Sequence, residues 1–169
     1  MSCNLTEDDI CLILGGIYGV ERGLDCAPNI LMYRWWHYGN PHDKDERLKK
    51  EYYTGEYEAD FLYITKSDYL YEVEIKISIA DFRADQKKKK YHDFPLVRGF
   101  YYCLPAELYW KYQNEILPVC KEKGAGIIII DGRPITILKP VQRKTVKPLD
   151  IYDRLYYLKL FAKKWLRKR

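Results

Sequence analysis

The sequence contains no long apolar run and no segment that resembles a secretory signal. Its apolar stretches stay short of the roughly 18 consecutive residues that a membrane-spanning helix needs. The first ten residues, MSCNLTEDDI, are acidic and polar rather than basic and then apolar. Internal repeats are also missing from the sequence. These absences predict a soluble, cytoplasmic protein that binds no membrane.

Cysteine and histidine are few and show none of the spacings of metal sites. The five cysteines are scattered without a CxxC pair, and the three histidines form neither HxH nor HExxH. A structural zinc site is therefore not expected. Cys11, Cys103 and Cys120 stand among apolar residues. This setting favours buried free thiols in a reducing compartment over a redox role.

Length and composition are those of one folded domain. Of the 169 residues, 47% are hydrophobic and 31% are charged, a balance typical of globular proteins. Tyrosine is unusually frequent, with 17 residues. Its ring can fill a core or present a flat surface with a polar rim. We expect a single domain over residues 1–169.

Positive charge is concentrated in two segments. The formal net charge is +5, and Lys87 to Lys90 form an unbroken run. The chain closes with AKKWLRKR, a second basic cluster. Such clusters can contact phosphate, but a charge run is also typical of a solvated face, so both interpretations stay open at this point.

The middle of the sequence alternates between strand and helix patterns. Two strand-like segments, ADFLYIT and YLYEVEIKISI, flank a polar KSD turn. A helix-forming segment follows, IADFRADQKKKKYHDF, and then a short strand, GFYYCLP. Next come a helix in PAELYWKYQNEILPVCKEKG and two strands about the turn of GIIIIDGRPITILKP. This order predicts an α/β fold with a mixed central sheet flanked by helices and a core over residues 56–143.

Further elements are expected on either side of this core. Thr6 and Asp9 have capping-box spacing, which predicts a helix that stops near Gly15, Gly16 or Gly19. Residues 20–45 look irregular, and DKDERLKKEYY predicts a helical turn or two. Trp35 and Trp36 fit core anchors or base-stacking platforms. The tail predicts an amphipathic helix with one apolar face, made of Ile151, Leu155, Leu158, Phe161 and Trp165.

The strand in YLYEVEIKISI carries three charges on one face. Side chains alternate along a strand, so Tyr69, Tyr71, Val73, Ile75, Ile77 and Ile79 share the face expected in the core. Leu70, Glu72, Glu74, Lys76 and Ser78 share the other. An unpaired charge costs several kcal/mol, roughly, to remove from water. This second face therefore needs either solvent or compensating partners.

The preceding strand supplies a partner if the hairpin has one particular register. With a three-residue loop, Lys66 to Asp68, residues whose numbers sum to 134 face each other, and Asp60 lies opposite Glu74. A loop of two or four residues would instead turn Asp60 into the core. Two neighbouring carboxylates repel unless a cation lies between them, and Mg²⁺ takes one or two protein carboxylates. Lys76 would then orient an attacking water or neutralise charge at phosphorus. A solvated face with a Glu–Lys pair is the alternative.

The arrangement of Asp60, Glu74 and Lys76 resembles the PD-(D/E)XK nuclease superfamily, although Ala59 stands where the proline of that motif would be. The segments EADFLYI, YEVEIKISIADFRADQKKKKYHDF and FYYCLPAEL are similar to the MmcB-type DNA repair proteins within it. The likeness covers residues 58–108 well and residues 124–143 more loosely. It implies a restriction-endonuclease-like core, whereas the N-terminal helical segment and the C-terminal amphipathic helix lie outside the likeness.

The resemblance also implies roles for individual residues. Asp60 and Glu74 would hold Mg²⁺ or Mn²⁺, and Lys76 would be catalytic. Accessory positions around the site are Glu58, Glu72, Ser78, Asp81 and Asp85. Contacts to nucleic acid would come from Lys87, Lys88, Lys89, Lys90 and Tyr91. An acidic residue from an N-terminal helix, common in the superfamily, has four open candidates: Glu21, Glu46, Glu51 and Glu58.

These observations lead to a metal-dependent DNA endonuclease or exonuclease as the expected function, with a role in DNA repair or processing implied by the resemblance. RNA stays open as a substrate, and a homodimer stays open as the assembly. Two alternatives are a nucleic-acid-binding protein without turnover and a protein-interaction scaffold that uses its tyrosine-rich surface. The first predicts binding with a steep salt dependence, and the second predicts no DNA binding at low salt.

Overall fold

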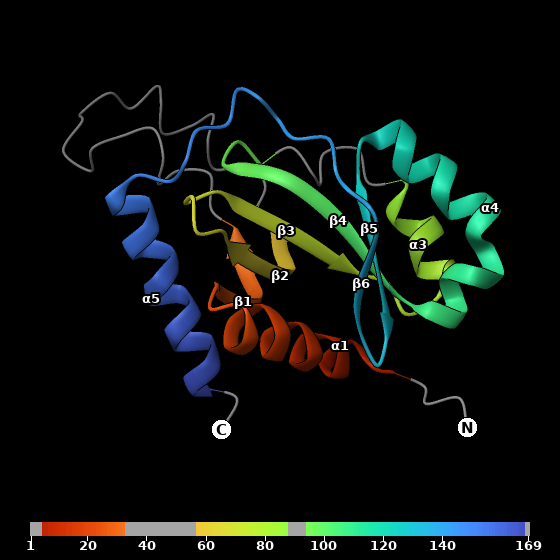
Figure 1. Cartoon of the computed structure of the whole chain (residues 1–169), viewed down its shortest axis with the longest axis horizontal. Coiled ribbons are helices and arrows are strands. Elements are labelled where there is room, and N and C mark those ends of the chain that lie inside the picture. The colour runs from red at the N-terminus through yellow and green to blue at the C-terminus, as the bar shows by residue number, and fades with distance from the viewer. Residues whose placement is uncertain (1–4, 33–56, 88–93, 168–169) are drawn as a thin grey trace.

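Six strands form one mixed sheet in the order β1-β2-β3-β4-β5-β6 (Figure 1). The computed structural model describes residues 5–32, 57–87 and 94–167. Neighbouring strands run antiparallel except for the parallel pairs β3–β4 and β4–β5. The strands are β1 (Asp25–Met32), β2 (Tyr57–Ile64), β3 (Leu70–Ile75), β4 (Val97–Pro105), β5 (Gly126–Asp131) and β6 (Arg133–Leu138). The expected α/β fold with a mixed, helix-flanked sheet is confirmed.

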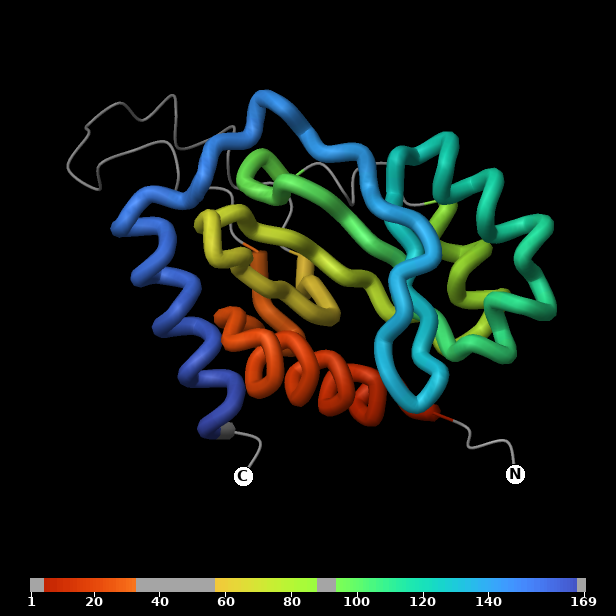
Figure 2. The backbone as a smooth tube through the Cα atoms, in the orientation of Figure 1, coloured from red at the N-terminus to blue at the C-terminus, as the bar shows by residue number. Residues whose placement is uncertain are grey.

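Helices cover both faces of the sheet, as the backbone trace shows (Figure 2). They are α1 (Glu7–Leu14), the π-helical η1 (Gly15–Glu21), α3 (Ile79–Asp85), α4 (Ala106–Lys123) and α5 (Ile151–Arg167). Ile10 and Leu14 of α1 pack on the face that presents Phe61 and Val73. Phe82 of α3 and Tyr109 of α4 join the core of the opposite face. Apolar side chains therefore pack on both faces of the sheet.

The strand β1 differs from the irregular structure expected for residues 20–45. It pairs with β2 along its length and contains Pro28 and Asn29. Proline is tolerated at a sheet edge, where its missing N–H costs no ladder bond, and β1 is an edge strand of this sheet. Asn29 has a left-handed backbone, with φ of 53°. These two residues hid the strand because both normally mark turns.

The N-terminal helix begins as expected and ends later. The Thr6 side chain accepts from the Asp9 N–H, and the Asp9 carboxylate accepts from the Thr6 N–H, so the capping box is confirmed. The glycines do not stop the helix, which continues through them as η1. The chain turns at Gly23, where φ is 63°. The chain stays helical here as a π-helix, although glycine usually favours a helix end.

Two expectations about apolar faces are wrong in part. β3 ends at Ile75, so Ile77, expected in the core, is 48% exposed. In α5, Phe161 is buried and Trp165 packs on the same cluster as expected, but Ile151 and Leu155 are exposed and Tyr157 is buried instead. The face of α5 that packs on the sheet is the one that carries the aromatic rings of Tyr157, Phe161 and Trp165. The tryptophan pair, the helical turn expected in DKDERLKKEYY and all three histidines lie outside the described residues.

Helix α5 is fastened to the start of β1 and to the β2–β3 turn. The Arg154 guanidinium donates to Asp25 at 2.9 Å and also to Asp68 in the turn. Leu149 N–H donates to the Asp68 carbonyl at 2.8 Å. Near the end of α5, Trp165 Nε1 donates to the Cys26 carbonyl at 2.8 Å. The last helix thus braces the hairpin that carries the charged strand.

Candidate active site

The β2–β3 hairpin has the register on which the carboxylate pairing depends. Phe61 pairs with Val73, and Tyr63 with Tyr71, so facing residues sum to 134. Thr65 N–H bonds to the Tyr69 carbonyl and closes a loop of three residues, the length on which the pairing was conditional, and Asp68 in this loop has φ of 62°. Extended by one position beyond its last pair, Phe61 with Val73, this register would put Asp60 opposite Glu74. Asp60 is half-buried rather than part of the core.

The Asp60 carboxylate lies where β2 and β3 separate. The last ladder pair is Phe61 with Val73, and the next N–H of β3 that faces β2, that of Ile75, donates to Asp60 Oδ2 at 2.7 Å. Burial and the charge of Glu74 raise the pKa of Asp60 to about 8, although the Ile75 bond works in the opposite direction. The ionised form of Asp60 is thus electrostatically unfavourable unless a cation balances its negative charge.

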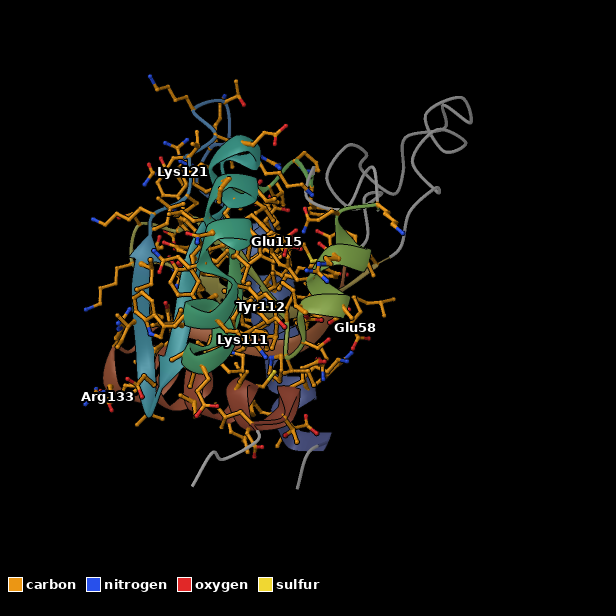
Figure 3. The ribbon with its side chains drawn as sticks, turned by 90° about the vertical axis from the view of Figure 1, so that its right-hand side faces the viewer. Glu58, Lys111, Tyr112, Glu115, Lys121 and Arg133 are labelled. Atoms are coloured by element: carbon orange, nitrogen blue, oxygen red, sulfur yellow. The ribbon has the colours of Figure 1, made fainter. Side chains whose placement is uncertain are left out.

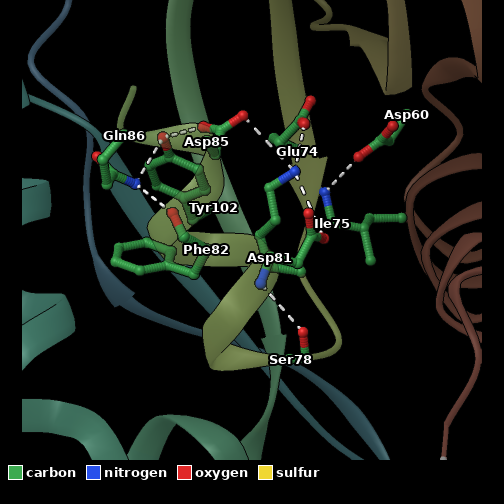
Figure 4. A network of polar contacts seen from close by, with 10 residues as sticks. Asp60, Glu74, Ile75, Ser78, Asp81, Phe82, Asp85, Gln86 and Tyr102 are labelled. Carbon is green, nitrogen blue, oxygen red and sulfur yellow. Dashed lines mark hydrogen bonds and ion pairs between the residues drawn. The ribbon is translucent and has the colours of Figure 1, made fainter. Parts of the chain in front are cut away.

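Glu74 and Lys76 form a buried ion pair next to Asp60. Lys76 Nζ lies 2.6 Å from Glu74 Oε1, and the two side chains are 4% and 2% exposed. Burial alone would lower the pKa of Lys76, but the charge and hydrogen bond of Glu74 together with two more carboxylates raise it above its ordinary value. Lys76 is therefore held as an ammonium among acidic groups. Figure 4 shows three of these groups, Glu74, Asp81 and Asp85, close to one another.

The two further carboxylates come from the start and end of α3. Asp81 Oδ2 and Asp85 Oδ1 each lie 3.7 Å from Lys76 Nζ. They share a face of the helix because they are four residues apart, as expected from the sequence. Ser78 caps the helix by accepting from the Asp81 N–H at 3.1 Å. The cap fixes the start of α3, so Ser78 acts through Asp81 rather than on Lys76 directly.

Asp85 is buried against a tyrosine of β4. The Tyr102 hydroxyl donates to Asp85 Oδ2 at 2.6 Å, and both side chains have no exposed surface. Tyr102 is the register partner of Glu74 across the parallel β3–β4 ladder, which places it beside the ion pair. Gln86 Nε2 donates to the Phe82 carbonyl and, more weakly at 3.4 Å, to the Tyr102 oxygen. Tyr102 was missed in the sequence because the register of a parallel pair cannot be read from either strand.

Helix α3 is anchored from its other side. Arg83 donates two hydrogen bonds to the Glu115 carboxylate of α4, at 2.7 and 2.8 Å. Figure 3 shows Glu115 and Tyr112 along α4, and the Arg83 guanidinium lies 6.0 Å from the Tyr112 ring. The Phe82 ring packs edge-on against Tyr102, with 5.0 Å between ring centres. These contacts hold Asp81 and Asp85 toward β3.

Glu72, one pleat earlier on the charged face, is completely buried. Its carboxylate accepts from the Tyr57 hydroxyl at 2.7 Å. Burial raises the pKa of Glu72 to about 8 despite this bond, and nearby Arg143 partly offsets the rise. The sequence prediction of an accessory position fits this placement, since Glu72 lies on the face of Glu74 but away from Lys76. Tyr57 and Arg143 were not foreseen.

The remaining expected residues are spread differently. Glu58 is exposed on β2 and is labelled at the periphery in Figure 3. Lys87 is exposed after α3, while Lys88, Lys89, Lys90 and Tyr91 lie outside the described residues. Glu21 ion-pairs with Arg133, and Glu46 and Glu51 lie outside the described residues.

An acidic residue of the N-terminal helix does approach the site, though it was not a candidate. Glu7, exposed in the first turn of α1, is close enough to Asp60 for its charge to raise the pKa of that carboxyl. Acidic residues are common in the first turn of a helix because they interact favourably with the helix dipole. The position of Glu7 therefore gave no sign of a link to the site. Glu7 adds negative charge to the side of Asp60 that faces α1.

The donor set fits a hard divalent cation that keeps most of its water. Asp60 and Glu74 offer two coupled carboxylates, and Mg²⁺ is commonly held by one or two with water completing its shell. Within the described ranges, no group of three or more His, Cys, Asp or Glu side chains is arranged to hold a metal ion. The cysteines Cys11, Cys26, Cys103 and Cys120 are free and buried, as expected for structural thiols.

Comparison with known proteins gives a relative in fold alone. No protein-family model matches the chain, and no curated protein is significantly similar to it. A solved structure, the SPO1766 protein of unknown function from Silicibacter pomeroyi, aligns with a TM-score of 0.54 and 17% sequence identity. The alignment covers 94% of this chain and 82% of that one. Along the described residues, no helix is both long and apolar enough to cross a bilayer.

Proposed function

We propose that this protein is a Mg²⁺- or Mn²⁺-dependent nuclease with a restriction-endonuclease-like core of the PD-(D/E)XK kind. The observation that carries the proposal is that Asp60, bound to the Ile75 N–H just past the last β2–β3 ladder pair, lies within the electrostatic reach of Glu74, which is ion-paired with Lys76. Two carboxylates and an ammonium on adjacent strands match the residue types that phosphodiester hydrolysis needs. A pure binding protein has no reason to put carboxylates beside phosphate.

Each group of the site has a separate task in this proposal. Asp60 and Glu74 would hold the divalent cation, which when bound supplies positive charge to the reacting phosphate and lowers the pKa of water. The Ile75 N–H bond orients the Asp60 carboxylate before any ligand arrives. The Lys76 ammonium, kept protonated by its acidic neighbours, orients the attacking water or stabilises charge developing at phosphorus.

Lys76 is positioned for this task by α3. Its Nζ is shared between Glu74 and the pair Asp81 and Asp85. If Glu74 held a cation, Asp81 and Asp85 would still hold the Lys76 ammonium in the site. The Lys76 side chain can therefore turn from Glu74 toward the substrate without losing its charge compensation.

A cleavage assay tests the proposal directly. Supercoiled plasmid, linear duplex, branched and single-stranded DNA, and RNA are incubated with Mg²⁺ or Mn²⁺ and the wild-type chain, Glu74→Gln or Lys76→Ala. We expect wild type to cleave at least one substrate, and both variants to lose at least 100-fold in rate while EDTA abolishes cleavage. The exposed Asp131→Asn, at the end of β5, serves as a matched control that keeps its activity. Equal inertness of wild type and variants on all substrates refutes the nuclease.

A further inference from the structure

An extended basic segment crosses the molecule between β6 and α5. Residues 139–149 contain four cationic side chains and no carboxylate. Lys139, Lys144 and Lys147 are exposed, and Arg143 is half-buried. Neither of the basic clusters apparent from the sequence includes this segment, because its cations are separated by apolar residues and proline rather than consecutive.

The segment is fastened to the sheet rather than loose. Val141 N–H donates to the Gly124 carbonyl at 2.8 Å, and Arg143 N–H donates to the Arg98 carbonyl at 2.9 Å. The Arg98 guanidinium returns a bond to the Val146 carbonyl at 3.1 Å. These bonds hold the backbone that carries the cations in a fixed course along the sheet. A fixed cationic surface loses less conformational entropy on binding than a flexible tail.

The end of α4 adds two more cations to the same surface. Lys121 and Lys123 are exposed in its last turn, and Lys121 is labelled at the upper end of the helix in Figure 3. The Gly124 bond to Val141 ties this turn to the basic segment. We call the six cations together the basic surface: Lys121, Lys123, Lys139, Arg143, Lys144 and Lys147.

A cavity of about 340 Å³ opens within the basic surface. Lys121, Lys123 and Arg143 line it, with Glu122 as the acidic side chain and Gly99, Phe100, Gly124 and Val141 as the rest of the wall. With three cations and one carboxylate in its wall, the cavity has a net positive charge. Arg143 also links the cavity to the candidate active site, because its Nη1 donates to the Phe94 carbonyl at 3.0 Å and its charge acts on Glu72.

We propose that the basic surface binds the sugar-phosphate backbone of nucleic acid, with one phosphate group in the cavity between Lys121, Lys123 and Arg143. Several fixed cations along an extended segment match a regularly charged polyanion. A protein interface would instead need an apolar or aromatic centre, and a lipid surface would need an amphipathic helix with apolar anchors. The inference rests on the proposed function only in making that nucleic acid the substrate.

Binding without turnover tests the basic surface. Fluorescence anisotropy of labelled duplex and single-stranded DNA is measured with the Glu74→Gln chain in EDTA. The salt concentration is varied from about 50 to about 300 mM, a range that includes physiological ionic strength. A triple variant, Lys139→Gln, Lys144→Gln and Lys147→Gln, is compared with Lys111→Gln, Lys159→Gln and Lys163→Gln. All six lysines are exposed, so the two variants lose the same charge and keep the fold.

The variant of the basic surface should reduce the slope of log K against log salt by about 2 to 3, close to 0.9 for each lost phosphate contact. Its Kd should rise at least tenfold, and that of the control variant less than threefold. Equal weakening of both variants, no binding by the parent chain, or equal competition by polyglutamate overturns the inference. If cleavage fails but binding depends on these lysines, the nuclease proposal falls alone. If cleavage succeeds and the basic-surface variant binds like its parent, the basic surface falls alone.

Discussion

The hydroxyl of Tyr102 donates a 2.6 Å hydrogen bond to Asp85, whose other oxygen lies 3.7 Å from Lys76 Nζ. A tyrosine of β4 is thereby connected through one carboxylate to the ammonium of β3. Because Tyr102 and Asp85 are fully buried, solvent cannot replace this bond if it is lost. Tyr102 is thus a positioning residue for Lys76 in the proposed reaction.

Replacing Tyr102 by phenylalanine should remove this support and leave the ring packing in place. We expect the free energy of unfolding to fall by about 1–3 kcal/mol, because a buried carboxylate loses its donor. The cleavage rate should fall by about tenfold or more, as for other partners that orient site residues, while KM changes little. Chemical denaturation and steady-state kinetics measure the two effects. Tyr109→Phe, in the same core cluster, is the control and should leave the cleavage rate within twofold.

Divalent cations should stabilise the folded chain through Asp60 and Glu74. In thermal denaturation, increasing Mg²⁺ or Mn²⁺ should raise the Tm of wild type. At a cation concentration of 100 times Kd, the free energy of unfolding should increase by about 2.7 kcal/mol. Glu74→Gln and Asp60→Asn should lose most of this rise. Lys76→Gln should keep or increase it, since the ammonium 2.6 Å from Glu74 competes with the cation. An unchanged rise in Glu74→Gln would show that the cation binds elsewhere.

The buried Glu72 should make stability fall as pH rises. Its pKa is about 8 in the folded chain and 4.5 as the reference for an accessible glutamate. The folded chain therefore holds the proton more tightly, so the stabilisation is fully present below about pH 4.5 and is lost as pH rises through 8. Between pH 5 and pH 9, the free energy of unfolding of wild type should fall by on the order of 1–3 kcal/mol more than that of Glu72→Gln. Urea denaturation at both pH values measures the difference, and exposed Glu58→Gln should show none.

Two adjacent glycines of η1 should respond oppositely to alanine. A Cβ on Gly15 would lie 2.8 Å from the Trp165 ring, whereas a Cβ on Gly16 would meet nothing within 4 Å. Gly15→Ala should therefore destabilise by about 1–3 kcal/mol through overpacking against α5. Gly16→Ala should be neutral or stabilising by up to about 1 kcal/mol, since alanine restricts the unfolded chain. Equal effects in denaturant titrations would contradict the close packing of Trp165 on η1.

Local patterns were enough to predict the parts of the fold in which one segment determines its own structure. The β2–β3 hairpin followed from alternation and a polar turn, whereas its register stayed conditional on a loop of three residues, which is the length found. The pair Asp81 and Asp85 followed from helical spacing. In each case the relevant neighbours are close in sequence, so periodicity carries the information.

The rest depended on contacts between distant segments. Tyr102 reaches Asp85 only through the parallel β3–β4 register, and Tyr57 reaches Glu72 only because β2 begins beside β3. β1 was hidden because Pro28 and Asn29 are tolerated there by an edge position that the sequence does not display. Nothing in the periodicity of α5 showed which of its apolar residues would turn toward the sheet.

The clamp of Arg154 on Asp25 and Asp68 gives the chain a particular order of assembly during synthesis. A ribosome makes residues 57–85, with the three carboxylates that contact Lys76, long before residues 149–165, which fasten the hairpin turn and the start of β1. The hairpin of a nascent chain must therefore keep its register by its own turn until the last helix emerges. Truncation before Leu149 would leave that turn in the same unfastened state permanently.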